Sequence, residues 1–260
     1  MIDIHSHILP GVDDGSPSME ASLDLARAAV AAGTQIMVAT PHVRGDYRLD
    51  LESIAERVDE VNLMLVSEGV KLRVVAGAEV SLSKAVELVR AELRTVCLGT
   101  GSYILVESPY TNTVADIEGI FFDLQVAGLR PVLAHPERCP VFQAEPERLA
   151  RLVDAGALCS ITSGSLAGRF GNTVRRFALR LVSEGLVHDV ASDCHDAVRR
   201  PPHLLPGIDQ AETDLPGFAE QAPWYTVTAP VAILAGKPLP ARPDPPSLRR
   251  SGLRRLFGGR

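Results

Sequence analysis

The chain is poor in cysteine and in aromatic residues. It has four cysteines among 260 residues, none of them in a C-x-x-C pair, and aromatic side chains make up 5% of the chain. This spacing excludes a zinc finger and any other thiolate-rich metal site. The four thiols are typical of reduced cysteines in a cytoplasmic protein.

The chain also lacks any long hydrophobic run. No apolar stretch reaches the roughly 18 residues that a membrane-spanning helix requires. The first residues enter a strand-like segment directly, without a basic stretch and an apolar signal region. The sequence therefore predicts a soluble, cytoplasmic protein.

Positive charge is scarce except near the end of the chain. The net charge is −6, but residues 237–260 carry +6, which leaves −12 on residues 1–236. So acidic a body argues against a nucleic-acid-binding surface. We expect residues 1–236 to form one domain, followed over 237–260 by a Pro-rich linker and an Arg-rich, disordered tail. A sharper alternative is that this tail contacts an acidic partner or the inner face of a membrane.

Strand-like and helix-like segments alternate along the chain. Residues 18–32, 51–67 and 84–93 show helical spacing of apolar residues, and short apolar runs separate such segments. The alternation repeats about seven times, with no hairpin signal between successive runs. This order predicts an α/β fold built as a parallel (β/α) barrel with seven clear strands.

Potential metal ligands occur where the strand-like runs end. His5 and His7 lie two residues apart on the opening strand, so their side chains point the same way. In (β/α) barrels the site lies at the C-terminal ends of the strands. The candidate ligands are His5, His7, Asp14, His42, Glu79, Glu107, His135, Asp193 and His195. This number suits two or three ions, and the oxygen and imidazole ligands favour Mn²⁺, with Fe²⁺ or Zn²⁺ as alternatives.

Several residues beside the ligand positions are candidates for binding and transferring a phosphoryl group. Arg138 and Arg200 are candidate phosphate clamps, because a guanidinium group forks onto phosphate oxygens. Arg44 and Tyr47 follow His42 and are candidates for the substrate rim. Asp193, or a water on the metal, is a candidate proton donor to the leaving oxygen.

A second phosphatase chemistry is also compatible with part of the sequence. Residues 194–200 match C-x5-R, the signature of phosphatases that use a cysteine thiolate. This segment lacks the glycines that open such a phosphate-binding loop. Pro201 and Pro202 follow where a helix should continue and donate its amides. The metal-centred interpretation is therefore preferred.

The ordered set of motifs resembles a known group of proteins. Six motifs carry the resemblance: Met1-Ile-Asp-Ile-His-Ser-His7, Val12-Asp-Asp-Gly15, Ala39-Thr-Pro-His42, Gly77-Ala-Glu79, Ala134-His-Pro-Glu-Arg138 and Ala191-Ser-Asp-Cys-His195. They are similar to the polymerase-and-histidinol-phosphatase (PHP) superfamily. More narrowly, they resemble its bacterial manganese-dependent protein-tyrosine phosphatases of capsule and exopolysaccharide synthesis, the CpsB/YwqE type. The resemblance covers residues 1 to about 236; it does not explain the tail, and Cys194 stands where a larger apolar residue is common.

The resemblance implies a distorted (β/α)7 PHP-type barrel that holds three metal ions. It assigns His5, His7, Glu79 and Asp193 to one ion, Glu79, Glu107 and His135 to a second, and Asp14, His42 and His195 to a third. Arg138 and Arg200 would bind phosphate. The implied substrate is phosphotyrosine in the Tyr-rich C-terminal tail of a bacterial tyrosine kinase, and the expected nucleophile is a metal-bound hydroxide that attacks phosphorus directly.

Two alternatives remain open on the sequence. The same chemistry could act on a small phosphate monoester such as histidinol phosphate or a nucleotide, which calls for a closed pocket instead of an open one. The chain could also be a non-catalytic metal-binding scaffold of the polysaccharide export machinery. A scaffold would bind the kinase without His5 and His7 and would release no phosphate.

Overall fold

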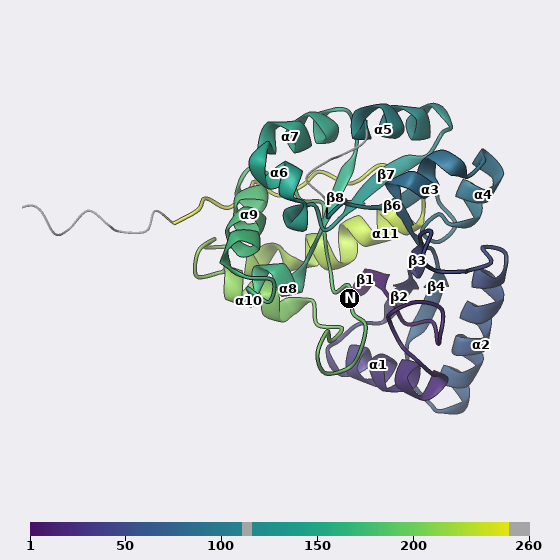
Figure 1. The fold of residues 1–260 in the computed structure, drawn as a ribbon. Helices are drawn as coiled ribbons and strands as arrows, with labels where there is room; N and C mark the ends of the chain where they lie inside the picture. Colours follow the sequence, from purple (N-terminus) through teal and green to yellow (C-terminus); the bar gives the residue numbers. More distant parts are fainter. Residues whose placement is uncertain (111–115, 250–260) are drawn as a thin grey trace, which may run out of the picture.

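The computed structural model describes residues 1–110 and 116–249 of the chain (Figure 1). The strands are β1 (Ile2–Ser6), β2 (Ile36–Ala39), β3 (His42–Val43), β4 (Arg73–Ala76), β5 (Glu79–Ser81), β6 (Tyr103–Glu107), β7 (Arg130–Ala134), β8 (Leu158–Thr162) and β9 (Asp189–Ala191). The α-helices are α1 (Met19–Ala31), α2 (Ser53–Ser67), α3 (Leu82–Glu87), α4 (Arg90–Thr95), α5 (Ile117–Val126), α6 (Pro140–Ala144), α7 (Pro146–Asp154), α8 (Ser163–Leu166), α9 (Asn172–Ser183), α10 (Leu205–Ala211) and α11 (Ala229–Leu234). Short 3₁₀ turns cover Pro136–Arg138 and Ala219–Gln221, and a π-helical turn covers Trp224–Thr228.

All strand pairs among the described residues are parallel, and they form two sheets. One sheet has the order β1-β2-β4 and the other β3-β5-β6-β7-β8-β9. The second sheet continues the first, because β2 pairs with β4 and the strands that follow them directly, β3 and β5, also pair. A parallel bridge between Ser6 and Cys194 joins the end of β1 to the segment after β9. The predicted α/β fold with parallel strands is thus confirmed.

Two apolar clusters lie on opposite faces of the strands. Ile104, Val106 and Leu133 belong to the larger cluster, which includes the helix side chains. Leu105 and Val132, which alternate with them, belong to a smaller cluster that also contains Ile2, Ile4 and Ile233. Because Ile233 comes from α11, this helix covers the face of the strands that the outer helices leave open. Each such buried side chain contributes about 1.5–3 kcal/mol to stability.

The helices cover the strands from outside, with α1 and α2 on one side and α5, α7 and α9 on the others (Figure 1). None of the helices in the described part of the chain combines the length and the apolar character needed to cross a bilayer. The predicted helix over residues 84–93 is wrong in one respect, because it is divided into α3 and α4. Leu88 adopts an extended conformation (ψ 135°), and the Glu92 carboxylate accepts a hydrogen bond from the Val89 amide to begin α4.

Residues 237–249, most of which belong to the predicted Pro-rich linker, dock on the body of the protein. The carbonyl of Lys237 accepts a hydrogen bond from the Tyr103 hydroxyl (2.9 Å), and the carbonyl of Ala241 accepts one from the Trp224 indole (3.0 Å). Leu239 packs against both apolar clusters. Proline fixes the extended backbone, so little entropy is lost when the segment docks. The remaining tail, residues 250–260, lies outside the described residues.

Ending the chain after residue 236 is expected to destabilise the fold, whereas ending it after residue 249 is not. The shorter chain loses the carbonyl partners of Tyr103 and Trp224 and the packing of Leu239. Losing such partners costs about 1–3 kcal/mol, so the Tm should fall by roughly 3–10 °C. Thermal unfolding followed by circular dichroism checks this; equal Tm values for the two truncations would contradict the docking of residues 237–249.

Candidate metal centre

The structure brings all nine predicted ligands together. His42 and Glu79 begin the short strands β3 and β5, which come directly after β2 and β4, and Glu107 ends β6. Their donor atoms form four overlapping groups, each with all atoms within 4.8 Å of one another. The groups are His7, Asp14, His42 and His195; His5, His7 and Asp193; His5, Glu79 and His135; and His42, Glu79 and Glu107. All but Asp14 are buried. The sharing of residues between groups indicates one continuous centre with room for more than one ion.

Glu79 lies in the middle of this centre and is fully buried. Its Oε1 lies 2.8 Å from His135 Nε2, and its Oε2 lies 3.2 Å from His5 Nε2, 3.0 Å from His42 Nδ1 and 3.6 Å from His7 Nε2. Burial alone would raise the pKa of Glu79, but the charge on His5 and the hydrogen bond with His135 lower it well below its usual range. Glu79 is therefore ionised, and its two oxygens face different groups of imidazoles, as a bridging carboxylate requires.

Two of the candidate ligands occupy strained turns that directly follow strands. His135 after β7 has φ 38° and Asp193 after β9 has φ 52°, both in the left-handed region that residues other than glycine rarely adopt. Such a conformation costs on the order of 1–3 kcal/mol at each position. The Asp193 amide donates to the His5 carbonyl (2.9 Å), which fixes the turn against β1. The left-handed backbone at these two positions directs both side chains into the centre.

The spacing of the donor atoms suits binding of divalent ions better than hydrogen bonding between the side chains. Among the described residues, His5 Nε2, His7 Nε2, His42 Nδ1, Glu79 Oε2 and His195 Nε2 are buried without a hydrogen-bond partner. When two ligand atoms each lie about 2.1 Å from the same ion, they lie about 3 Å from one another. The distances between the Glu79 oxygens and the imidazole nitrogens are close to this value. A cation would offset the cost of about 1–3 kcal/mol for each unpaired buried atom.

The protonation of two further imidazoles also suits metal binding. Burial and the charge of Arg138 lower the pKa of His135 to about 4, and burial lowers the pKa of His195. Both rings are therefore neutral at pH 7, which is the form that binds a metal ion. The donor set contains imidazole and carboxylate but no thiolate, which matches hard or borderline divalent ions.

Asp13 is a supporting residue that the sequence analysis missed. Its Oδ2 lies 2.8 Å from His7 Nδ1 and accepts from the His42 amide (3.0 Å), while its Oδ1 accepts from the Gly15 amide (2.9 Å). A carboxylate on the far nitrogen fixes the orientation of a metal-binding imidazole. Burial opposes protonation of His7, but the hydrogen bond with Asp13 and the nearby charge of Asp193 raise its pKa to about 10. A cation that binds Nε2 would therefore displace a proton from this ring. The pair of adjacent acids at 13 and 14 was the available signal.

Two other buried acids hold the ligand-bearing turns in place. Glu137 accepts from the Thr162 amide (3.0 Å) and from Ser165 Oγ (2.6 Å), which ties the turn after β7 to β8 and α8. Asp3 accepts from the amide and the hydroxyl of Ser192, which ties β1 to the segment that carries Asp193. Neither role could be predicted from a local sequence pattern, because the partners are distant along the chain.

The two predicted phosphate clamps converge on one carboxylate. Arg138 Nη2 and Arg200 Nη2 both donate to Asp193 Oδ2, the latter at 2.6 Å. The Arg138 guanidinium lies 4.3 Å from the centroid of the Phe170 ring, and its Nη1 donates to the Tyr110 hydroxyl (3.4 Å). Both arginines thus lie at the edge of the centre, as predicted, and Tyr110 and Phe170 are neighbours that the sequence did not reveal.

The predicted rim residues contact two of the candidate ligands. Arg44 Nη1 donates to Glu107 Oε1 (3.1 Å), and the Tyr47 ring stacks on His42 with centroids 5.6 Å apart. Burial and the charge of Glu79 raise the pKa of Glu107, while Arg44 and His42 oppose that shift.

The centre opens to solvent through a small cavity. This cavity has a volume of about 110 Å³ and is lined by seven of the nine candidate ligands together with Arg44, Tyr110 and Arg200. Asp14 reaches it with a side chain that is 51% exposed. A phosphate group can therefore approach the ligands and Arg200 from outside the molecule.

Cys194 is unsuited to the alternative thiolate chemistry. Its side chain is fully buried, and burial raises the pKa of its thiol well above its usual range. The next helix, α10, begins only at Leu205, so no helix N-terminus faces the thiol from directly after Arg200. The C-x5-R match is therefore incidental.

The arrangement matches a family of known proteins. A family model described as capsular polysaccharide synthesis, CpsB/CapC, matches residues 1–215. The tyrosine-protein phosphatase YwqE of Bacillus subtilis is 38% identical over 259 residues, which span 99% of both chains. The chain belongs to the CpsB/CapC family. This finding confirms the resemblance to the CpsB/YwqE type.

A further relative and a solved structure are consistent with membership of the CpsB/CapC family. The tyrosine-protein phosphatase CpsB of Streptococcus pneumoniae is 31% identical over 217 residues, or 80% of this chain and 88% of that protein. A solved structure from a study of YwqE and CpsB, called there unique metal-dependent tyrosine phosphatases, superposes with a TM-score of 0.83 at 37% identity. That match covers 96% of this chain and all of the other. A β-aspartyl dipeptidase of Fervidobacterium islandicum (TM-score 0.55, 18% identity) shares the fold alone.

Replacing Glu79 with Gln is expected to abolish most of the stabilisation by metal ions. At about 100 times its dissociation constant an ion that binds only the folded protein adds about 2.7 kcal/mol. The substitution removes the charge that faces four imidazoles, so the rise in Tm on adding Mn²⁺ should largely disappear. Glu60→Gln, at an exposed position of α2, is the matched control and should keep the full rise. Equal rises in Tm for the two variants would contradict the assignment.

Proposed function

We propose that this protein is a metal-dependent protein-tyrosine phosphatase. The observation that carries the proposal is the convergence of nine metal-type ligands with two arginines at one edge of the sheets. Whole-length similarity to a protein named as a tyrosine-protein phosphatase supports the same conclusion. A phosphomonoesterase needs both parts, because ions and guanidinium groups together neutralise the transferring phosphoryl group.

The proposed cofactor is Mn²⁺, in two or three ions. The four ligand groups supply imidazole nitrogens and carboxylate oxygens only, which favours Mn²⁺ and also admits Fe²⁺ or Zn²⁺. Glu79, shared by two groups, would bridge two ions. Asp14, His42 and His195 would form the outermost site, since Asp14 is the exposed member of its group.

Arg138 and Arg200 would bind the phosphate, and Asp193 would position the two arginines. When bound, the ions would polarise the phosphoryl oxygens and lower the pKa of an attacking water. Arg138 and Arg200 can turn their free N–H groups to the phosphoryl oxygens while Asp193 holds the two guanidinium groups side by side. Burial opposes ionisation of Asp193, but Arg138 and His5 lower its pKa well below its usual range. Asp193 would therefore orient the two arginines and is also a candidate ligand, while its role as proton donor to the leaving oxygen stays a prediction.

We also propose that the two sheets form one distorted (β/α)7 barrel of the PHP type. Counting β2 with β3 and β4 with β5 gives seven strands in sequence order, and the bridge between Ser6 and Cys194 brings the first beside the last. On this view residues 1–236 form the catalytic unit, and residues 237–249 are a strap across its surface. The placement of Ile233 on the inner face supports this arrangement.

The proposed substrate is a phosphorylated bacterial tyrosine kinase of capsular or exopolysaccharide synthesis. The family description places related chains in capsular polysaccharide synthesis. The solvent-facing side of the centre, where Asp14 is half exposed, suits a phosphotyrosine on a protein surface better than an enclosed small ester. Contact of residues 250–260 with a membrane stays a prediction, which truncation after residue 249 would test on the membrane-bound kinase.

Phosphate release from a phosphotyrosyl peptide tests the proposed function. Turnover should require Mn²⁺, stop with excess chelator and return when the ion is restored. Cys194→Ser should keep turnover within about threefold, because the buried thiol takes no part in the chemistry. Turnover that persists in chelator and is lost in Cys194→Ser would overturn the proposal in favour of the thiolate mechanism.

A further inference from the structure

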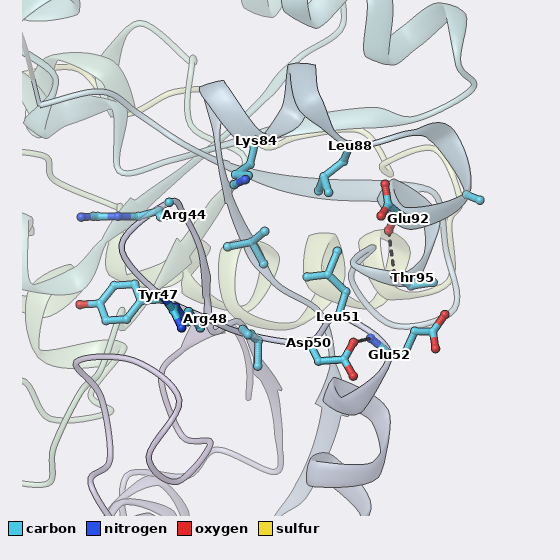
Figure 2. A pocket seen from close by; sticks show the side chains of 14 residues that line it. Arg44, Tyr47, Arg48, Asp50, Leu51, Glu52, Lys84, Leu88, Glu92 and Thr95 are labelled. Atoms are coloured by element: carbon cyan, nitrogen blue, oxygen red, sulfur yellow. Dashed lines mark hydrogen bonds between the residues drawn. The ribbon is translucent and has the colours of Figure 1, made fainter.

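A second, larger cavity lies next to the metal centre. It has a volume of about 770 Å³, within the usual range for ligand sites, against about 110 Å³ for the cavity over the ligands. The loop that follows β3 forms one wall, and α3, α4 and the break between them form the other (Figure 2). We call this cavity the flanking groove. Leu88, whose extended backbone separates α3 from α4, is one of its lining residues.

The flanking groove adjoins the cavity of the metal centre. Arg44 lines both cavities. Tyr47, which also lines the groove, stacks on the candidate ligand His42. Figure 2 shows the Arg44 and Tyr47 side chains at one end of the groove, directed away from its middle. A molecule with its phosphate on the centre would therefore extend into the groove past these two residues.

The chemistry of the groove changes along its length. Arg48 and Lys84 lie toward the end marked by Arg44 (Figure 2). In the middle, Leu51 and Leu88 face one another across the groove. Glu52 and Glu92 lie at the far end. Leu51 and Leu88 are only partly buried although they pack against the main apolar cluster. An extended peptide presents side chains at intervals of about 3.3 Å, so several of its residues would meet these three zones in turn.

Arg48 and Lys84 are the cations available to a ligand at the near end. Arg44 is already engaged by Asp46 and Glu107. Lys84 pairs with Glu87, which is largely exposed. Arg48 is itself exposed. An acidic side chain entering beside Arg44 would thus find two partners without displacing a buried pair.

We propose that the flanking groove binds the residues that flank the phosphotyrosine in the protein substrate, which rests on the proposed phosphatase function. The favoured flank carries an acidic residue next to the phosphotyrosine, then an apolar residue between Leu51 and Leu88. An acidic residue further out is disfavoured by Glu52 and Glu92. The groove selects the substrate sequence, while the metal centre selects the phosphoryl group.

Leu88→Glu tests the apolar zone by comparing two substrates. One is a phosphotyrosyl peptide with the favoured flank, and the other is p-nitrophenyl phosphate, which is too small to enter the groove. We expect the ratio of kcat/KM for the peptide to kcat/KM for p-nitrophenyl phosphate to fall about tenfold, through KM. Val86→Glu, on the exposed face of α3 and outside the groove, is the matched control and should leave the ratio unchanged.

Arg48→Glu tests the charged zone with peptides that differ only in the residue beside the phosphotyrosine. The unaltered protein should prefer the acidic flank over the basic flank by about fivefold or more, and the variant should lose or reverse that preference. An unchanged ratio in Leu88→Glu together with equal use of the two peptides by the unaltered protein would overturn the groove assignment. Absence of turnover on every substrate with Mn²⁺ would instead overturn the proposed function.

Discussion

A fully buried carboxylate, that of Glu79, lies among the rings of His5, His7, His42 and His135. Taking a charge of this kind out of water costs several kcal/mol unless opposite charge surrounds it. The imidazoles supply part of that charge, and the unpaired nitrogen and oxygen atoms between them leave a place for cations. The parallel sheets bring these groups together, because His42 and Glu79 come directly after β2 and β4 in the same way as His135 comes after β7.

The centre is held by a set of buried polar contacts that do not touch the substrate. Asp13 fixes the ring of His7, Glu137 fixes the turn that carries His135 and Arg138, and Asp3 ties β1 to the segment that carries Asp193. These contacts compensate for the left-handed backbone at His135 and Asp193. With the ligands held in place, the proposed selection of the substrate sequence would lie with side chains of the rim, including Arg44 and Arg48.

The sequence predicts the strands and the nine candidate ligands because both follow local patterns. Most of the ligands either alternate on the opening strand, as His5 and His7 do, or follow an apolar run, as His135 does. Asp14 belongs instead to the motif Val12-Asp-Asp-Gly15. Asp13, Glu137 and Tyr110 escaped prediction because their roles depend on partners from other strands. The break at Leu88 also escaped prediction, because the helical spacing of apolar residues continues through it. The docking of residues 237–249 escaped prediction because their partners, such as Trp224, belong to no recognisable motif.

Anomalous X-ray scattering from crystals grown with Mn²⁺ tests the central claim most directly. The account predicts at least two anomalous peaks within about 2.5 Å of the predicted ligand atoms, with Glu79 shared between two of them. Peaks confined to the surface of the molecule, or a centre in which the imidazoles and Glu79 hold only water, would contradict it.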